Sequence, residues 1–302
     1  MIFFRKLAKN ILPYYIVKKY QSSRAPAPSA DPHAPGGYYS PIPSLEEIKG
    51  FNFNDSLPET LPGIDLNYEE QMSLLDSFEP FFKELPFTDE KTEGLRFYYK
   101  NDYYSYSDAI LLYCMIRHLR PQRIIEAGSG FSSSVTLDTN EKFMGGSIDC
   151  IFIEPNPQRL ETLLKNNDAE KVKIHKSRLQ EVPLEVFREL SKNDILFIDS
   201  THVTKFNSDV NYAIHEILPA LASGVHIHFH DVFYPFEYPR KWLLRGVAWN
   251  EQYMLRAFLE YNSAFKIVMF NTYLENVHES KIRHRFPLLY KNTGGSIWLK
   301  KL

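Results

Sequence analysis

From residue 123 onward, short apolar runs alternate with longer stretches of amphipathic, helix-like sequence. The apolar runs have the length of buried strands and lie at residues 123–127, 148–153, 172–175, 195–199 and 225–229. The helix-like stretches lie near residues 132–140, 157–166, 183–190 and 208–221. Nearly continuous apolar strands that are separated by helices predict a parallel sheet covered on both faces.

Two further apolar runs, at residues 265–270 and 296–300, follow a helical stretch near 248–261. The segment between these runs is basic and polar at residues 278–285, and we expect no helix in it. A connection without a helix favours an antiparallel pair over another parallel crossover. The pattern therefore predicts an α/β fold with a Rossmann-like, seven-stranded sheet, in which an antiparallel terminal pair follows five parallel strands.

The N-terminal third of the chain has a different character. Residues 1–20 combine apolar positions at helical spacing with Lys and Arg, which predicts a basic amphipathic helix. Two interpretations stay open: the helix lies in an anionic membrane surface, or it docks on the protein or on a second subunit of a homo-oligomer. We expect a flexible Pro/Ala/Ser linker at 21–43, a helical cap or arm at 44–120, with a capping box from Asn67 to Glu70, and the main domain at 121–302.

The composition gives no indication of a nucleic-acid-binding, disulfide-rich or membrane-spanning protein. The chain has 302 residues, 44% of them hydrophobic, and a formal net charge of −2, so nothing in its overall charge indicates nucleic-acid binding. Its two cysteines, Cys114 and Cys150, form neither a disulfide framework nor a zinc-ligand spacing. No apolar run is long enough to cross a bilayer. We expect a cytoplasmic protein, located at the inner face of the membrane if residues 1–20 bind lipid.

The turn after the first predicted strand carries the main candidate chemistry. Glu126 ends the strand, Gly128 and Gly130 form a turn, and a helix is expected to begin at Ser132. Glycines allow a ligand to approach the backbone, and the helix end offers unpaired N–H groups. Glu126 would repel a diphosphate but attract the ammonium and sulfonium of S-adenosylmethionine. The turn therefore favours methyl transfer over hydride transfer.

The next two strands add candidate cofactor contacts. Glu154 ends the second strand, where a carboxylate can accept both ribose hydroxyls. The alternative is that Glu154 only caps the helix that follows. Gln180 follows the third strand, at the expected position of an adenine ring. The predicted cofactor-binding set is Glu126, Gly128, Ser129, Gly130, Ser132, Glu154, Gln180 and Asp199.

The fourth and fifth strands end in acids and histidines. Methylation of an alcohol needs a base or a metal, because alcohols hold their protons tightly near neutral pH. His202 is the predicted base, because an unperturbed imidazole titrates near pH ~6.5, and Asp199 would orient it or bind a cation. The predicted catalytic residues are His202, Asp199 and Asp231, and a candidate Mg²⁺ or Mn²⁺ site consists of Asp199, His230 and Asp231.

The fifth strand carries two more histidines on the same face as His230. His228 and His226 lie two and four residues, respectively, before His230 at the strand tip. We expect them to be hydrogen-bonded core residues under a helix and not metal ligands.

Taken together, these motifs resemble the class I S-adenosylmethionine-dependent methyltransferases over about residues 95–300, in particular a bacterial branch of sugar and polysaccharide O-methyltransferases. The chain is also similar to metal-dependent sugar O-methyltransferases, whose Asp-x-x-His unit supplies a metal ligand and a catalytic histidine. Asp199 and His202 match that unit. Those relatives carry paired acids after the fifth strand, whereas this chain has His230 and Asp231. The resemblance implies a small-molecule or glycan substrate, a role in polysaccharide biosynthesis, and an N-terminal helix that tethers the enzyme to the membrane.

Two other functions remain open on the sequence alone. One is a non-catalytic binding or scaffold protein that kept the nucleotide-binding fold. The other is an NAD-dependent oxidoreductase, against which two features argue. Ser133 stands near the place of the third glycine of the dinucleotide motif, and Glu126 is poorly placed for a pyrophosphate.

Overall fold

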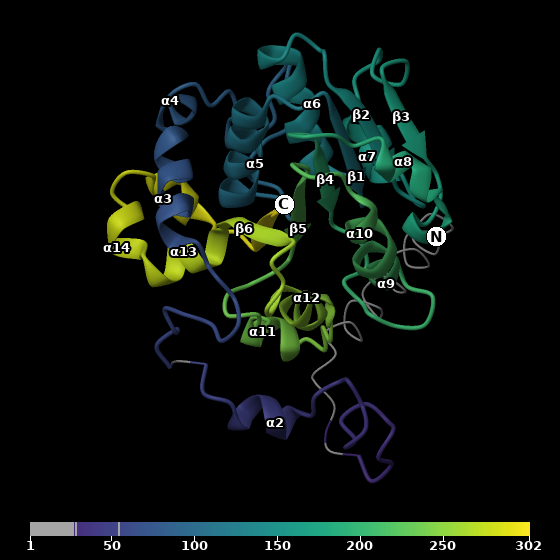
Figure 1. Cartoon of the computed structure of the whole chain (residues 1–302), viewed down its shortest axis with the longest axis vertical. Helices are drawn as coiled ribbons and strands as arrows, with labels where there is room; N and C mark the ends of the chain where they lie inside the picture. Colours follow the sequence, from purple (N-terminus) through teal and green to yellow (C-terminus); the bar gives the residue numbers. More distant parts are fainter. Residues whose placement is uncertain (1–26, 28, 54) are drawn as a thin grey trace, which may run out of the picture. The chain divides into compact units, whose positions relative to one another are not determined.

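The computed structural model describes residues 27, 29–53 and 55–302, so the helix predicted at 1–20 lies outside the described part. The chain divides into two compact units. The smaller unit contains the described residues up to Ser56 together with Tyr238–Trp249, and includes α2 (Leu45–Gly50) and α11 (Arg240–Leu243) (Figure 1). In α2, Ser44 and Glu47 form a reciprocal capping box.

The larger unit, Leu57–Glu237 with Asn250–Leu302, contains a seven-stranded sheet. The strand order is β3-β2-β1-β4-β5-β7-β6. Neighbours among β1 to β5 pair in parallel, and β7 pairs antiparallel with both β5 and β6. The predicted fold class is therefore confirmed. The strands are β1 (Arg123–Ala127), β2 (Asp149–Ile153), β3 (Val172–His175), β4 (Ile195–Ile198), β5 (His226–His230), β6 (Phe265–Phe270) and β7 (Ser296–Lys301).

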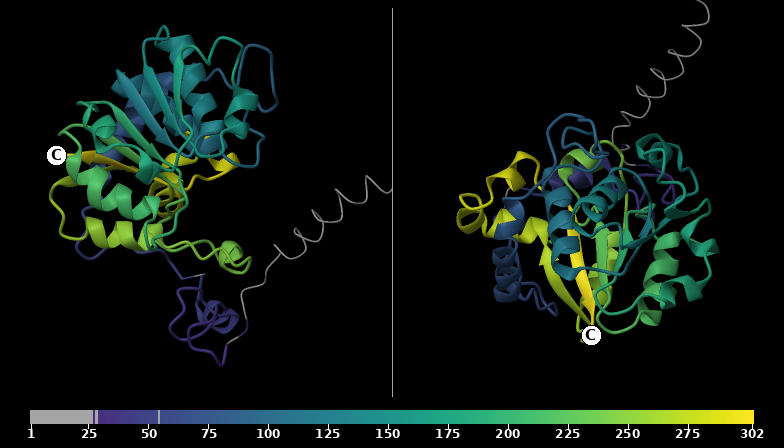
Figure 2. Two further views of the ribbon diagram at one scale, coloured as in Figure 1. Left: turned by 90° about the vertical axis from the view of Figure 1, so that its right-hand side faces the viewer. Right: turned by 90° about the horizontal axis from the view of Figure 1, so that it is seen from above.

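Helices flank this sheet on both sides (Figure 2). Every residue of β4 and β5 is buried, as expected for strands that are covered on both faces. The helices of the larger unit up to β5 are α3 (Tyr68–Ser77), α4 (Glu79–Phe82), α5 (Tyr106–Leu119), α6 (Phe131–Phe143), α7 (Gln158–Leu163), α8 (Leu184–Arg188), α9 (Asp209–Tyr212) and α10 (Leu218–Ala220). A π-helical turn, Ala213–Ile217, joins α9 to α10, and α12 (Glu251–Leu259) follows β5.

Two local expectations are wrong. The connection between β6 and β7 contains α13 (Asn271–Val277), α14 (Glu279–Ile282) and a 3₁₀ turn, although the antiparallel pairing itself is confirmed. Antiparallel strands do not require a short connection, and the basic residues at 278–285 lie in the helical segment that joins β6 to β7. Asn67 does not cap α3 with its side chain, because it adopts a left-handed conformation (φ 51°) and donates to the Asp65 carbonyl instead.

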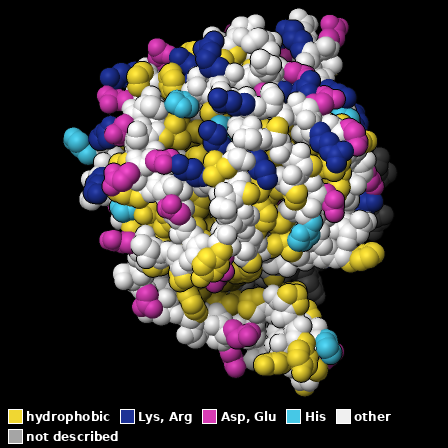
Figure 3. Space-filling model, viewed as in Figure 1, with side chains coloured by type: hydrophobic (Ala, Val, Ile, Leu, Met, Phe, Trp, Pro, Cys, Tyr) yellow, Lys and Arg dark blue, Asp and Glu magenta, His cyan; other side chains and the backbone are white. Residues whose placement is uncertain are grey.

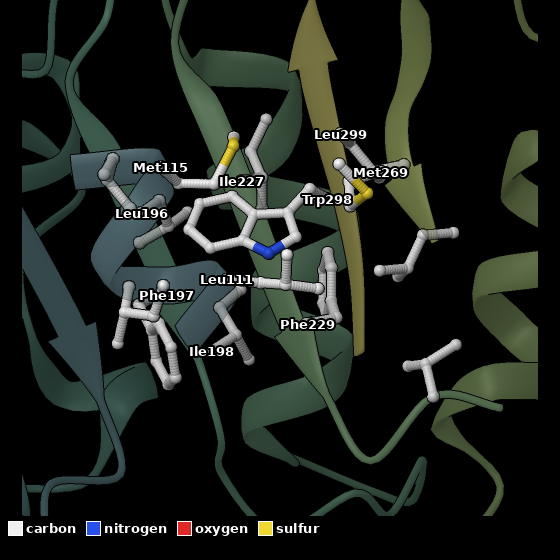
Figure 4. Close-up of a cluster of buried hydrophobic side chains, with 14 of the residues drawn as sticks. Leu111, Met115, Leu196, Phe197, Ile198, Ile227, Phe229, Met269, Trp298 and Leu299 are labelled. Atoms are coloured by element: carbon white, nitrogen blue, oxygen red, sulfur yellow. The ribbon is translucent and has the colours of Figure 1, made fainter. Parts of the chain in front are cut away.

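The core of the larger unit lies between α5 and the centre of the sheet. Trp298 of β7 packs among side chains from α5, β4, β5 and β6, including Leu111, Leu196 and Ile227 (Figure 4). His228 is fully buried here, with its ring 4.1 Å from that of Phe197 and 4.6 Å from that of Trp298, centroid to centroid.

The expected hydrogen bonding of His228 is wrong. Neither ring nitrogen of His228 has a hydrogen-bond partner among the described residues, and aromatic packing holds the ring instead. Burial lowers the pKa of His228 to about 3, so the ring is neutral. His226 is also buried, and its Nδ1 likewise has no partner in the described part of the chain.

The surface seen in Figure 3 carries interspersed basic and acidic side chains over the larger unit. Many of these charges are paired, as in Arg285 with Asp76 and Arg123 with Glu189. No helix in the described ranges is both long enough and apolar enough to cross a membrane.

Candidate functional site

The turn after β1 brings two strand ends into contact. Gly128 has φ +83°, which favours glycine, and its N–H donates to the Ile153 carbonyl at 3.0 Å. Gly130 caps α6, and its N–H donates to Oγ of Ser133 at 3.0 Å. The predicted strand–turn–helix arrangement is therefore present, with the helix beginning at Phe131.

Glu126 lies beneath this turn. Its side chain is fully buried, and its Oε1 accepts hydrogen bonds from Ser132 (2.6 Å) and Ser133 (2.8 Å). Its Oε2 has no hydrogen-bond partner among the described residues. Burial raises the pKa of Glu126 to about 8, against the opposing effect of the two serine hydrogen bonds. Glu126 does not line the adjacent cavity, and its contact with a ligand stays a prediction.

A cavity of about 510 Å³ opens at the carboxyl ends of β1, β2 and β4. Ligands bind at this edge in open α/β sheets. The lining residues come from four loops and comprise 127–128, 153–155, 178–180, 199–201 and 205–209. The cavity therefore contains Gly128, Glu154, Gln180 and Asp199 of the predicted cofactor set, whereas Ser129, Gly130 and Ser132 lie outside its lining.

Some polar atoms of the cavity wall form hydrogen bonds within the protein, and others do not. Glu154 accepts hydrogen bonds from the N–H groups of Ser129 (3.3 Å) and Asn156 (2.7 Å), so its carboxylate orders both neighbouring turns. Gln180 donates to the Asn207 carbonyl at 2.8 Å. The Oε1 of Gln180 and the Oγ of Ser200 are buried without a partner in the described part of the chain. Unpaired polar atoms on a cavity wall suit a ligand that carries hydroxyl and amino groups.

The ends of β4 and β5 assemble a compact cluster of acids and histidines. Oδ1 of Asp199 lies 3.2 Å from Nε2 of His202 and 3.3 Å from Nδ1 of His230. Asp231 lies 3.6 Å from His202 and 3.8 Å from His230. One candidate ligand atom each from Asp199, His230 and Asp231 lies within 4.8 Å of the others. The structure therefore brings together the four residues predicted for catalysis and cation binding.

Two acids that the sequence reasoning missed complete the cluster. Oε2 of Glu251, on α12, lies 2.8 Å from Nδ1 of His202, and Oδ2 of Asp108, on α5, lies 3.5 Å from Nε2 of His230. Asp108 is itself held by Ser296 at 2.8 Å. Both acids are buried. The available signal was that Asp108 directly precedes the apolar helical run 109–116.

Tyr104, two residues before the start of α5, also contacts this cluster. The ring of Tyr104 packs against that of His230, with centroids 5.1 Å apart, and its hydroxyl donates to the Asp108 carbonyl at 3.1 Å. Tyr103 is exposed and stacks on Phe131. Tyr104 thus contacts both His230 and the backbone of Asp108, the cluster's residue on α5.

The acids and histidines of the cluster shift one another's pKa values. Burial alone would raise the pKa of Asp199, but His230 and His202 hold it well below its ordinary value. Burial lowers the pKa of His202, but hydrogen bonds with Asp199 and Glu251 outweigh it and raise that pKa to about 10. Burial raises the pKa of Asp231 to about 6. The assumption that His202 titrates near its ordinary value is therefore wrong, because the carboxylates of Asp199 and Glu251 hold its proton.

The comparisons with known proteins agree with this geometry. Residues 125–232, which run from β1 to just past β5, match the family model of a methyltransferase domain. An uncharacterised protein of Archaeoglobus fulgidus is 34% identical over 168 residues, which cover 53% of this chain and 75% of that protein.

Solved structures share a distant likeness with the chain. The O-methyltransferase TomG from Streptomyces achromogenes, in complex with SAM, has a TM-score of 0.42 at 15% identity and covers 77% of this chain and 89% of its own. The SAH-bound Podospora anserina methyltransferase PaMTH1 has a TM-score of 0.43 at 13% identity, with 82% and 100% covered. The matched residues 125–232 contain the glycine turn and strands β2 to β5 of the seven-stranded sheet, and the chain belongs to the class I S-adenosylmethionine-dependent methyltransferases.

Proposed function

We propose that the protein transfers a methyl group from S-adenosylmethionine to a hydroxyl group of a sugar or glycan intermediate. The observation that carries the proposal is the position of Asp199. This residue lines the 510 Å³ cavity and also contacts both histidines of the cluster. The methyl donor and the proton-transfer groups would therefore meet at one side chain.

The cavity fits the methyl donor in chemical type. Glu154 would accept the ribose hydroxyls, and the unpaired Oε1 of Gln180 would accept a hydrogen bond from the adenine amino group. The absence of a side chain at Gly128 lets the backbone of Asp199 pack directly against the turn after β1, which places Asp199 at the cavity. When bound, the sulfonium supplies an activated methyl group, and the carboxylate of Asp199 favours this positive charge at the cavity wall.

The cluster fits a divalent cation. Nδ1 of His230 is buried without a hydrogen-bond partner among the described residues, and it faces the carboxylates of Asp199 and Asp231. Two carboxylates and one imidazole form a mixed donor set, which suits Mn²⁺ and also allows Mg²⁺. When bound, such a cation would make a substrate hydroxyl more acidic.

His202 would take the proton of the attacking hydroxyl. Its Nδ1 is held by Glu251, and its Nε2 lies at the strand edge beside Asp199 and Asp231. Asp199 and Glu251 keep the imidazole protonated, so acceptance of a proton requires that Asp199 engage another positive charge. A sugar or glycan acceptor is supported by the resemblance of the Asp199–His202 unit to that of sugar O-methyltransferases.

Calorimetric titration with S-adenosylmethionine tests the first step, and absence of binding at millimolar ligand would end the proposal. The second step is a methyl-transfer assay with a panel of sugars and glycan extracts, read by mass spectrometry. We expect His202→Asn to bind the donor normally and to lose activity. The matched control is His215→Asn, because His215 is an exposed histidine in the helical segment after β4.

A further inference from the structure

We infer that Glu251 and the first turn of α12 position His202 for proton transfer, an inference that rests on the proposed function and adds to it a positioning residue. His202 follows β4, whereas Glu251 lies 49 residues further along the chain. The geometry joins them through both the backbone and the side chains.

The backbone of His202 is held in an unusual conformation. Its φ is +59°, in the left-handed region that costs a non-glycine residue about 1 kcal/mol or more. Its carbonyl oxygen accepts hydrogen bonds from the N–H groups of both Asn250 and Glu251, each at 3.1 Å. Such a conformation persists only where its surroundings fix it, and here the start of α12 supplies the donors.

A second pair of hydrogen bonds fastens the same loop. Oδ1 of Asn250 accepts from the N–H of Thr204 at 2.6 Å, and Nδ2 of Asn250 donates to the Thr204 carbonyl at 3.2 Å. The loop from His202 to Thr204 is therefore attached to α12 on both sides of Val203. Movement of α12 would carry His202 with it.

The side chain of Glu251 then sets the orientation of the ring. Glu251 is 1% exposed, and its Oε2 lies 2.8 Å from Nδ1 of His202. A buried carboxylate in this position keeps a hydrogen atom on Nδ1, which directs Nε2 toward Asp199 and Asp231. The ring therefore presents Nε2, and not Nδ1, at the edge where the substrate hydroxyl must arrive.

The test compares Glu251→Gln, Glu251→Asp and Glu251→Ala with wild type. A matched control is Glu260→Gln, an acid at the other end of α12 that pairs with Arg256 and lies away from the cluster. The readouts are kcat, the dissociation constant for S-adenosylmethionine, and the proton NMR signal of the Nδ1–H of His202. Circular dichroism checks that each variant is folded.

We expect Glu251→Gln to lower kcat by about 10- to 100-fold while donor affinity stays within twofold. The Nδ1–H signal should move upfield in Glu251→Gln and vanish in Glu251→Ala, Glu251→Asp should recover part of kcat, and Glu260→Gln should match wild type. An unchanged kcat and an unchanged Nδ1–H signal in Glu251→Gln would overturn the inference. The NMR signal can be measured without a substrate. If the protein methylated no hydroxyl, the signal would still show whether Glu251 orients His202. A failure of the Glu251 inference can therefore be distinguished from a failure of the proposed function.

Discussion

The carbonyl oxygen of Asp199 occupies the space in which a side chain at Gly128 would begin: a Cβ built on Gly128 would lie 1.6 Å from it. The N–H of Asp199 also donates to the Ala127 carbonyl at 2.8 Å. The glycine turn after β1 and the first acid of the cluster are therefore fixed against each other. Any residue larger than glycine at position 128 must displace Asp199.

This contact makes Gly128→Ala the sharpest test of the turn. We expect the substitution to lower the free energy of unfolding by about 3 kcal/mol or more, because it adds a backbone collision to an unfavourable φ. Gly94→Ala is the matched control, since Gly94 has nearly the same φ (+80°) but no atom within 4 Å of a built Cβ. It should lose only about 1–2 kcal/mol in urea unfolding. Equal losses in the two variants would contradict the role of the Asp199 contact.

Phe206 provides a test of the donor cavity. Its side chain is 98% exposed in a loop that lines the cavity, so its removal should leave stability within about 0.5 kcal/mol. We expect Phe206→Ala to weaken donor binding roughly threefold to tenfold in calorimetry, because an aromatic ring at the rim can pack on the adenine. Phe206→Trp should retain affinity. Tyr261→Ala, at an exposed tyrosine outside this cavity, serves as control, and equal affinities for Phe206→Ala and wild type would exclude the contact.

The sheet and the centre of the site could be predicted from the sequence for one physical reason. Parallel strands place their carboxyl ends at one edge, so the acids and histidines that follow β4 and β5 must lie close together. That reasoning brings Asp199, His202, His230 and Asp231 into one cluster, as the structure shows.

The remaining parts of the site depend on contacts that no local pattern encodes. Asp108 and Glu251 come from α5 and α12, and neither belongs to a motif with fixed spacing from the strands. The raised pKa of His202 follows from these long-range neighbours, so composition and spacing could not reveal it. The same holds for the helices between β6 and β7, because antiparallel pairing constrains the strands but not the path that joins them.

Cation binding can be tested at Asp231 without reference to a substrate. We expect Mn²⁺, titrated by electron paramagnetic resonance, to bind the wild-type protein and to bind Asp231→Asn at least about 10-fold more weakly, because one of two carboxylate ligands is lost. Asp102→Asn, at an exposed aspartate in the loop before α5, should bind as wild type does. Chelation should abolish methyl transfer and added Mn²⁺ should restore it. Full activity in excess chelator, with no Mn²⁺ bound, would exclude the proposed site.

Glu126 should make stability depend on pH in a defined direction. Burial raises its pKa to about 8 in the folded protein, whereas an unfolded glutamate titrates near pH ~4.3. Between these values the folded state holds a proton that the unfolded state has released, so the stability from this group is complete below pH ~4 and is lost as the pH rises through 8.

Glu126→Gln removes this titration and keeps an acceptor for Ser132 and Ser133. We therefore expect the unfolding free energy of Glu126→Gln, relative to wild type, to increase between pH 5 and pH 9 by at least about 1.4 kcal/mol, the value of one pKa unit. Urea unfolding at both pH values measures the difference, with the exposed Glu93→Gln as control. A difference that does not change with pH would mean that Glu126 is ionised in the folded protein, and the carboxylate would then already carry the charge that attracts a cationic donor.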